Sequence, residues 1–404
     1  MMSKTVISLS SAAVALALTC GSVTAQVAVK IGVMSDMTGP YADFSGPGSL
    51  EAVRMAVEDF RAVNRALAVE VVSADPQNKP DNAATVARRW FDTENVDLII
   101  DVPTSGVALA VAGIAKEKNK VMIATTAGTS DITGKACTPN TLHWVWDTWS
   151  SSHGTAEAVV KSGGKSWYFL TADYTFGTTM EREASDVVKA NGGTILGSVR
   201  HPLGATDFSS FLLQAQNSKA QIIGLANGGA DTINAIKTAG EFGIVAGGQK
   251  LVGLIVFIND IHALGLKSSH GLQLTTAFYW DLNDKTRTFG ERFAKRMDGK
   301  MPSMSQAGSY SATFAYLNAV AKTGSAKDGA AVVSNLRAAG VFDDPLFGKT
   351  SVRADGRVIH DMYLVEVKKP DESKKPWDYY KVVSVMPGDK AFRPLSEGAC
   401  PLAK

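Results

Sequence analysis

The six histidines are the first side chains to consider for catalysis, because imidazole is a common general base and zinc ligand. They are scattered along the chain without the short spacing of a metal-ligand motif: His143, His153, His201, His262, His270 and His360. The chain also lacks a GxSxG nucleophile elbow, an HExxH zinc motif and a GxxxxGK[ST] phosphate loop, and no GxGxxG follows the first expected strand. We therefore expect no enzyme, no metal site and no cofactor.

Hydroxyl side chains stand after two of the expected strands. Ser105 follows Thr104 at the start of an expected helix, and Thr126 follows the expected strand 121–124. The free N–H groups and the dipole of a helix N-terminus favour an anion such as a carboxylate. These residues predict a carboxylate-binding position, and ordinary helix caps are the alternative interpretation.

Aromatic side chains gather at the same kind of position. They are Tyr41, Phe44, Trp149, Tyr174, Phe176, Phe278, Tyr279 and Trp280. Core packing explains any one of them, but as a set they indicate an apolar ligand body held between parts of the chain. The loop within residues 30–60 that carries Tyr41 and Phe44 lacks a phosphate-binding glycine pattern, so it predicts a pocket wall.

The elements that must position these residues alternate between strand and helix. Strands of a first series are expected to begin at Ile31 and to lie at 69–73, 97–102 and 121–124. Strands of a second series are expected at 167–171, 194–200, 221–225 and 250–256, and a hairpin-like β section at 350–353 and 362–367. This alternation predicts parallel α/β sheets. In such sheets ligands bind beyond the carboxyl ends of the strands.

The first 25 residues have the composition of an export signal. Lys4 precedes an apolar stretch at 12–18, and small residues at 23–25 precede Gln26. The apolar stretch is too short to span a bilayer, so we expect an exported chain that begins near Gln26. A buried N-terminal helix and a lipoprotein anchored at Cys20 are the alternatives, and the residues before Cys20 fit lipoprotein cleavage poorly.

Charge and cysteine usage narrow the class of protein further. The 41 basic and 39 acidic residues nearly balance, which gives no footprint for nucleic acid or an anionic membrane. Beyond Cys20 the chain has only Cys137 and Cys400. Because two cysteines in an exported protein are more often paired than free, we expect a Cys137–Cys400 disulfide, with two free thiols as the alternative.

Several short segments, taken in order, resemble the type I solute-binding proteins of ABC importers, in their branched-chain amino acid-binding branch. The segments are Ile31-Gly32-Val33, Thr38-Gly39-Pro40-Tyr41-Ala42, Asp75-Pro76-Gln77, Ile123 to Thr133, Thr171 to Gly177, and Thr206-Asp207-Phe208-Ser209. Each segment is weak evidence alone. Their order behind an export signal extends the resemblance over nearly all of the mature chain.

This resemblance implies two doubly wound parallel α/β lobes joined by three chain crossings, with the ligand in the cleft between them. We expect the crossings near Asp147, Thr275 and Phe347. Lobe 1 would comprise residues 26–147 and 276–346, and lobe 2 residues 148–275 and 347–404. The protein would be a periplasmic monomer whose partners are a small ligand and the permease subunits of an importer in the inner membrane.

The resemblance also implies roles for individual residues. Ser105 and Thr126 occupy the positions that hold the ligand carboxylate in the family. Phe44 and Phe176 occupy positions of aromatic pocket walls. Gly128 stands where the amino acid binders have a threonine that helps to hold the α-amino group.

One departure from the family pattern bears on the ligand. Amino acid binders place an acidic residue against the ligand ammonium, and that position is Ile255 here. A buried ammonium without a carboxylate is strongly unfavourable, so either Asp231 takes over or the ligand has no ammonium. We favour a ligand without an ammonium. The expected ligand-binding set is Tyr41, Phe44, Ser105, Thr126, Gly128, Trp149, Phe176, Asp231, Ile255 and Tyr279.

The sequence therefore predicts capture of a small carboxylate with an apolar or aromatic body between two closing lobes, for uptake by an ABC importer. A periplasmic sensor of the same fold is an alternative. A binder of a hydrophobic amino acid, an amide or urea is another. A secreted enzyme on an α/β scaffold is a third, and no residue in the sequence favours it.

Overall fold

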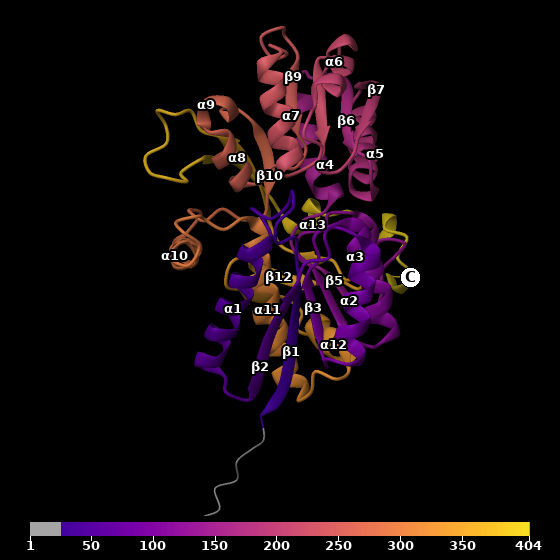
Figure 1. Ribbon diagram of the computed structural model, residues 1–404, viewed down its shortest axis with the longest axis vertical. Helices are drawn as coiled ribbons and strands as arrows, with labels where there is room; N and C mark the ends of the chain where they lie inside the picture. Colours follow the sequence, from indigo (N-terminus) through magenta and orange to yellow (C-terminus); the bar gives the residue numbers. More distant parts are fainter. Residues whose placement is uncertain (1–25, 404) are drawn as a thin grey trace, which may run out of the picture.

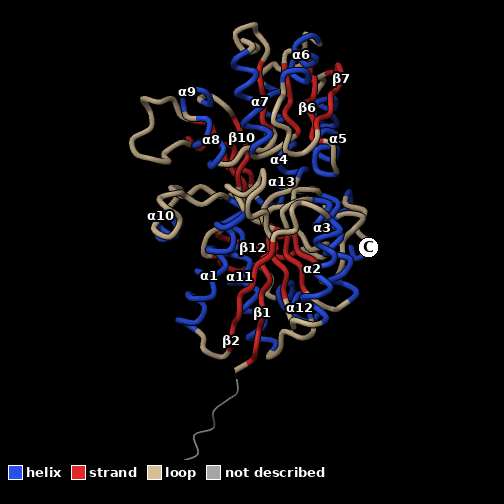
Figure 2. Tube along the Cα trace, in the orientation of Figure 1, coloured by secondary structure: helices blue, strands red, loops and turns tan. Residues whose placement is uncertain are grey.

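The computed structural model describes residues 26–403, and the predicted export signal lies outside them. Two lobes are stacked along the long axis of the molecule (Figure 1), and in each of them helices pack around a sheet (Figure 2). Both main sheets are parallel, so the predicted two-lobed α/β fold is confirmed. Among the described residues no helix is both long enough and apolar enough to cross a membrane.

Lobe 1 contains a five-stranded sheet in the order β2-β1-β3-β4-β5. Its strands are β1 (Val27–Met34), β2 (Leu67–Ala74), β3 (Leu98–Asp101), β4 (Val121–Ala124) and β5 (Thr141–His143). Its helices are α1 (Gly46–Val63), α2 (Pro80–Asp92), α3 (Ser105–Glu117), η1 (Ser130–Thr133), α10 (Asp284–Ala294), α11 (Met304–Thr323) and α12 (Gly329–Ala338). Every residue of β3 and β4 is buried, as is typical of central parallel strands covered on both faces.

Lobe 2 contains a four-stranded parallel sheet in the order β7-β6-β8-β9. Its strands are β6 (Ser166–Ala172), β7 (Thr194–His201), β8 (Ile222–Ala226) and β9 (Lys250–Gly253). Its helices are α4 (Thr148–Lys161), α5 (Thr175–Ala190), α6 (Ser209–Asn217), α7 (Ala230–Glu241), α8 (Ile258–Leu264) and α9 (Leu266–Ser269). The strand expected at 250–256 ends at Gly253, so Ile255 lies in the loop that follows.

Two small antiparallel sheets complete the fold. One has the order β10-β14-β15, with β10 (Gln273–Thr276), β14 (Met362–Val367) and β15 (Tyr380–Met386). The other has the order β11-β12-β13, with β11 (Phe342–Asp344), β12 (Gly348–Val352) and β13 (Val358–Ile359). The expected hairpin between 350–353 and 362–367 is wrong, because the turn at Gly356 (φ 85°) sends the chain back at once to pair β12 with β13.

The first predicted crossing, near Asp147, follows β5, and the second, near Thr275, lies in β10. Residues just before the third crossing stay with lobe 1, since Arg357 forms a bridge with His143 of β5. We therefore propose that the third crossing lies at residues 360–361 rather than near Phe347. The other boundaries stay as predicted.

A buried ion pair joins the first crossing to the segment before the third. The Asp147 carboxylate accepts a hydrogen bond from the Ser150 N–H (2.8 Å) at the start of α4 and lies 3.3 Å from the Arg357 guanidinium. Arg357 is fully buried and also donates to the carbonyl of Trp146 (3.1 Å). Burial alone would raise the pKa of Asp147, but the Arg357 charge holds that pKa below its usual value.

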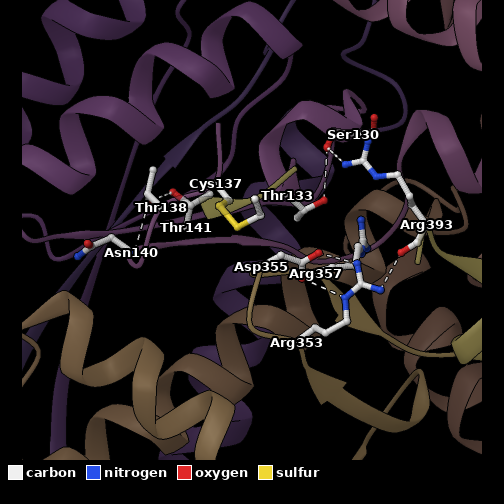
Figure 3. The surroundings of a disulfide bond; sticks show 11 residues. Ser130, Thr133, Cys137, Thr138, Asn140, Thr141, Arg353, Asp355, Arg357 and Arg393 are labelled. Atoms are coloured by element: carbon white, nitrogen blue, oxygen red, sulfur yellow. Dashed lines mark hydrogen bonds and ion pairs between the residues drawn. A yellow bond between two sulfur atoms is a disulfide. The ribbon is translucent and has the colours of Figure 1, made fainter. Parts of the chain in front are cut away.

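The C-terminal tail runs from β15, in the sheet β10-β14-β15, back to lobe 1, where Cys400 is bonded to Cys137 (Figure 3). The two Cα atoms are 5.7 Å apart, although 263 positions separate them in sequence. Beside the disulfide, Arg393 donates to the carbonyl of Ser130 (2.9 Å), and Arg353 donates to the carbonyl of Arg393 (2.8 Å). The tail is thus held by polar contacts as well as by the covalent bond.

Replacing both cysteines by serine, Cys137→Ser with Cys400→Ser, should lower the free energy of unfolding. In the chain-entropy model a closed loop of this length stabilises the fold by at most roughly 5 kcal/mol. Urea denaturation of the oxidised wild type and the double variant measures the difference. An unchanged midpoint would show that the buried packing of the tail suffices without the disulfide.

Candidate functional site

A small cavity lies between the lobes, and every residue that lines it follows the carboxyl end of a strand. Lobe 1 and the first crossing contribute Tyr41, Phe44, Pro103, Ser105, Thr126, Gly128 and Trp146. Lobe 2 contributes Tyr174, Phe176, Gly228, Ile255 and Phe257. Parallel sheets direct ligands to this edge, so the cavity is the candidate binding site.

The structure brings seven of the ten expected ligand-binding residues together in this lining. They are Tyr41, Phe44, Ser105, Thr126, Gly128, Phe176 and Ile255. Their contact with a ligand stays a prediction, but their convergence from distant parts of the chain gives that prediction a definite location.

The other three expected residues lie outside the lining. Trp149, in the first turn of α4, stacks on His153 with ring centroids 3.6 Å apart. Tyr279 follows β10 and donates its hydroxyl to Asp378 (3.2 Å). Asp231, in the first turn of α7, accepts a hydrogen bond from the backbone of the 204–205 loop. We leave these three residues out of the candidate site.

The lining also contains residues that were not chosen from the sequence. They are Pro103, Trp146, Tyr174, Gly228 and Phe257. Tyr174 stood among the aromatics at strand ends and could have been chosen on that ground. Phe257 was not chosen because β9 was expected to run to residue 256. Trp146 was not chosen because it lies directly before the expected first crossing.

Aromatic rings from both lobes close the cavity. Phe44 of lobe 1 and Phe257 of lobe 2 stack face to face, with centroids 3.8 Å apart and planes 6° apart. Trp146 presents an edge to Phe257 (5.9 Å, 74°) and to Phe176 (6.0 Å, 86°). Parallel and edge-to-face contacts are both favourable geometries for aromatic pairs. Aromatic rings from both lobes therefore form the walls of the cavity.

A hydrogen bond between the hydroxyls of Tyr41 and Tyr174 also joins the lobes across the cleft. Burial is the main reason that the pKa of each tyrosine is raised above its ordinary value, and the nearby Asp231 carboxylate adds to the effect. Both tyrosines are therefore protonated at neutral pH. One of their two hydroxyl hydrogens is used in the bond between them, and the other is available to a ligand.

The anion-binding position predicted from Ser105 falls on the first turn of α3. Within the described residues the side chain of Thr104, which precedes the helix, makes no hydrogen bond to its free N–H groups. The Ser105 hydroxyl accepts a hydrogen bond from the Thr129 N–H (3.2 Å), which leaves its own hydrogen to donate. A carboxylate at this end of the cavity would meet the Ser105 hydroxyl and the helix N–H groups.

Thr126 contributes differently from Ser105, because its hydroxyl donates to the buried carboxylate of Asp101. Ser35, Ser45 (3.1 Å) and Thr125 (2.9 Å) donate to the same carboxylate. Burial raises the pKa of Asp101, and these four hydroxyl donors partly offset the rise. Asp101 thereby fixes the loops after β1, β3 and β4, and its own backbone has a left-handed φ of 84°.

Among the described residues that line the cavity, no side chain carries a formal charge. An ammonium group in this cavity would therefore lack an anionic partner. The position of Gly128 reinforces the apolar character, because a Cβ there would lie 2.4 Å from Cη2 of Trp146 and 3.1 Å from Phe176. The rings of Trp146 and Phe176 thus occupy the space that a larger residue 128 would need.

A buried carboxyl group holds the Phe257 wall in place. The Phe257 N–H donates to Oδ2 of Asp260 (2.8 Å) in the first turn of α8. Burial raises the pKa of Asp260 to about 7, and the charge of Asp43 acts in the same direction.

Comparison with known proteins identifies relatives along nearly the whole chain. Residues 28–374 match the family model described as "Periplasmic binding protein". A periplasmic binding protein from Burkholderia mallei is 52% identical, with a TM-score of 0.90 over 93% of this chain and 99% of that chain. A branched chain amino acid ABC transporter periplasmic ligand-binding protein from Burkholderia xenovorans is 41% identical, with a TM-score of 0.81 over 93% of this chain and 100% of that chain.

More distant relatives show the same pattern. The Leu/Ile/Val-binding protein homolog 6 of Brucella melitensis is 26% identical over 353 residues, which are 85% of this chain and 88% of that protein. An ABC transporter solute-binding protein from R. palustris, in complex with benzoate, has a TM-score of 0.78 over 89% of this chain and 96% of that chain. Its identity of 20% makes this a likeness of fold.

The raised pKa of Asp260 predicts how stability depends on pH. The folded state keeps the proton up to about pH 7, whereas an unfolded aspartic acid releases it near pH 4. The unfolding free energy should therefore fall as pH rises between these values, by about 1.4 kcal/mol per unit of pKa difference. In the variant Asp260→Asn the side chain can still accept a hydrogen bond from the Phe257 N–H. Its unfolding free energy, measured by urea denaturation, should fall less between pH 5 and pH 8 than that of the wild type.

The matched control is Asp284→Asn, since the Asp284 side chain is 97% exposed. It should keep the pH dependence of the wild type. If Asp260→Asn and the wild type showed the same fall in unfolding free energy, the proton would not be held at Asp260.

Proposed function

Because the chain belongs to the periplasmic binding protein family, we propose that it is the substrate-binding component of an ABC importer of the branched-chain amino acid-binding type. On this proposal the protein is exported to the periplasm as a monomer. It captures a small molecule between its lobes and delivers it to the permease subunits of the importer. Relatives with such a role in their names, at up to 41% identity, support the proposal.

The proposed ligand is a small carboxylate with an apolar or aromatic body. The observation that carries this proposal is the lining of the cavity, which joins aromatic walls to the free N-terminus of α3 and contains no charged side chain among the described residues. A carboxylate meets the helix N–H groups and the Ser105 hydroxyl. A flat body packs against the aromatic walls, which rings such as Phe44 and Phe257 form.

The same lining argues against an ordinary amino acid as the ligand. A ligand ammonium would need a carboxylate partner, and the candidate Asp231 lies outside the lining, hydrogen-bonded to the N–H of Gly204 (3.1 Å). The position that the family pattern makes acidic is Ile255, which is buried. The benzoate complex of the R. palustris protein is in keeping with an aromatic acid as the ligand class.

Ligand capture on this proposal is a shift between open and closed forms. Phe44 and Phe257 touch each other directly across the cleft, so a ligand can enter only when the lobes or these rings separate. Closure around the ligand then restores aromatic contacts and the hydroxyl bond between Tyr41 and Tyr174. The ligand favours the closed form by the contacts that it makes with both lobes at once.

The first test of this proposal compares benzoate with leucine in calorimetric titrations of the purified protein. Leucine should bind at least about 100-fold more weakly, because its ammonium loses hydration without gaining a partner. Isoleucine serves as a second amino acid. Tight binding of leucine or isoleucine would contradict the proposed ligand class.

A second test removes one wall of the cavity. Phe44→Ala should weaken benzoate binding by roughly 10- to 100-fold, because Phe257 loses its stacking partner across the cleft and the cavity opens to water. Phe242→Ala is the matched control, since Phe242 lies on the surface of lobe 2 with 37% of its area exposed. If both variants bound benzoate as the wild type does, the loop after β1 would be scaffold only.

A further inference from the structure

Trp146 lines the cavity, and its indole N–H has no hydrogen-bond partner in the part of the chain that the structure describes. The side chain is only 3% exposed. Buried donors in native proteins are nearly always paired, and an exception points to a missing partner. Trp146 lines the cavity, so a ligand held there is positioned to supply that partner.

Other buried tryptophans show how this chain satisfies the same group inside the protein. Trp144 donates its indole N–H to the Ser311 hydroxyl (2.7 Å), and Trp167 donates to the Gly164 carbonyl (2.8 Å). Trp280 donates to the carbonyl of Trp377 (2.9 Å). Trp146 differs from these three in lining the cavity.

The orientation of the Trp146 ring separates its N–H from the carboxylate position. The atoms that face Gly128, next to the Thr126 loop, are Cη2 and Cζ3 of the six-membered ring. The N–H belongs to the five-membered ring at the other end of the side chain. The Trp146 backbone is fixed, because its carbonyl accepts from buried Arg357 (3.1 Å). The indole therefore offers its hydrogen away from the anion-binding end.

The hydroxyl groups of Tyr41 and Tyr174, which also line the cavity, hold a second hydrogen-bond donor. Tyr41 and Tyr174 share one hydrogen in their mutual bond and keep the other. Among the described residues that line the cavity no side chain is a charged acceptor. A ligand atom that meets the Trp146 N–H must therefore accept a hydrogen bond.

We propose that Trp146 is a specificity-determining residue, whose N–H donates to an oxygen on the ring of the ligand, separate from the carboxylate held at Ser105. The preferred ligands are then aromatic carboxylates that carry a ring oxygen. This inference rests on the proposed function and refines its ligand class. It predicts that a ring oxygen adds affinity through a hydrogen bond from the Trp146 N–H.

Calorimetric titrations with benzoate, 3-hydroxybenzoate and 4-hydroxybenzoate test the inference. One of the hydroxybenzoates should bind the wild type about tenfold more tightly than benzoate does. Trp146→Phe should abolish that advantage, and it should also weaken benzoate binding, because the indole ring is itself part of the cavity wall. Trp149→Phe, which alters a tryptophan outside the cavity three positions away, should keep the advantage.

Two outcomes would overturn the inference. One is a hydroxybenzoate advantage that survives in Trp146→Phe, as it would if the variant lost benzoate and hydroxybenzoate affinity equally. The other is the absence of any advantage in the wild type. Failure of all three acids to bind the wild type is a distinct result, because it would overturn the proposed function and this inference with it.

A measurement on the wild type keeps the inference falsifiable if Trp146→Phe fails to fold. In ¹⁵N-labelled protein the indole N–H resonances of the seven tryptophans can be followed during titration. The Trp146 resonance should move downfield and its hydrogen exchange should slow with the tighter hydroxybenzoate, and much less with benzoate. Equal changes with both acids would overturn the inference.

Discussion

The geometry of the cleft depends on the buried pair of Asp147 and Arg357. Asp147 caps the first helix of lobe 2, and Arg357 precedes the third crossing, so the pair joins two of the three connections between the lobes. Arg357 also holds the Trp146 carbonyl and lies 4.2 Å from the centre of the Phe392 ring. Since neither charge can lose its partner without remaining unpaired in the interior, this arrangement strongly resists change.

The neighbourhood of this pair carries little charge that can vary. His143, which pairs with Arg357 through the backbone, has its pKa lowered to about 3 by burial and by the Arg357 charge. It therefore stays neutral at any pH at which the protein works. The charge at the crossings thus does not vary through His143, whereas Asp260 behind the Phe257 wall, with a pKa of about 7, titrates near neutral pH.

Much of the fold and part of the site could be predicted from the sequence. Short buried strands such as 121–124 show as continuous apolar runs, and Ser105 and Phe44 follow such strands directly. Strand ends were harder to place, because Leu254 to Val256 are as apolar as the strand before them. Because of that ambiguity Ile255 was expected within a strand and Phe257 was not chosen as a site residue, although both line the cavity.

Other parts of the site depend on contacts between distant segments, which local patterns do not contain. Trp146 and Trp149 are three residues apart and equally aromatic, yet only Trp146 faces the cleft, because Asp147 starts α4 between them. Tyr279 follows a strand and so looks like a wall residue, but its hydroxyl donates a hydrogen bond to Asp378, in a loop about 100 residues later. The third crossing that we propose differs from the predicted one for the same reason, since the bridge of Arg357 to His143 joins segments far apart in sequence.

The tail that ends in the disulfide makes a fourth covalent connection between the lobes. The tail follows β15 of the sheet β10-β14-β15. At the proposed third crossing its Phe392 packs against His360, with ring centroids 5.3 Å apart. It is then anchored in lobe 1 by the bond to Cys137. A tether that runs along the crossings keeps nearly constant length during rotation about them, but it resists any movement that pulls the lobes apart. On the proposed capture mechanism, the disulfide-anchored tail therefore favours opening by rotation over opening by separation of the lobes.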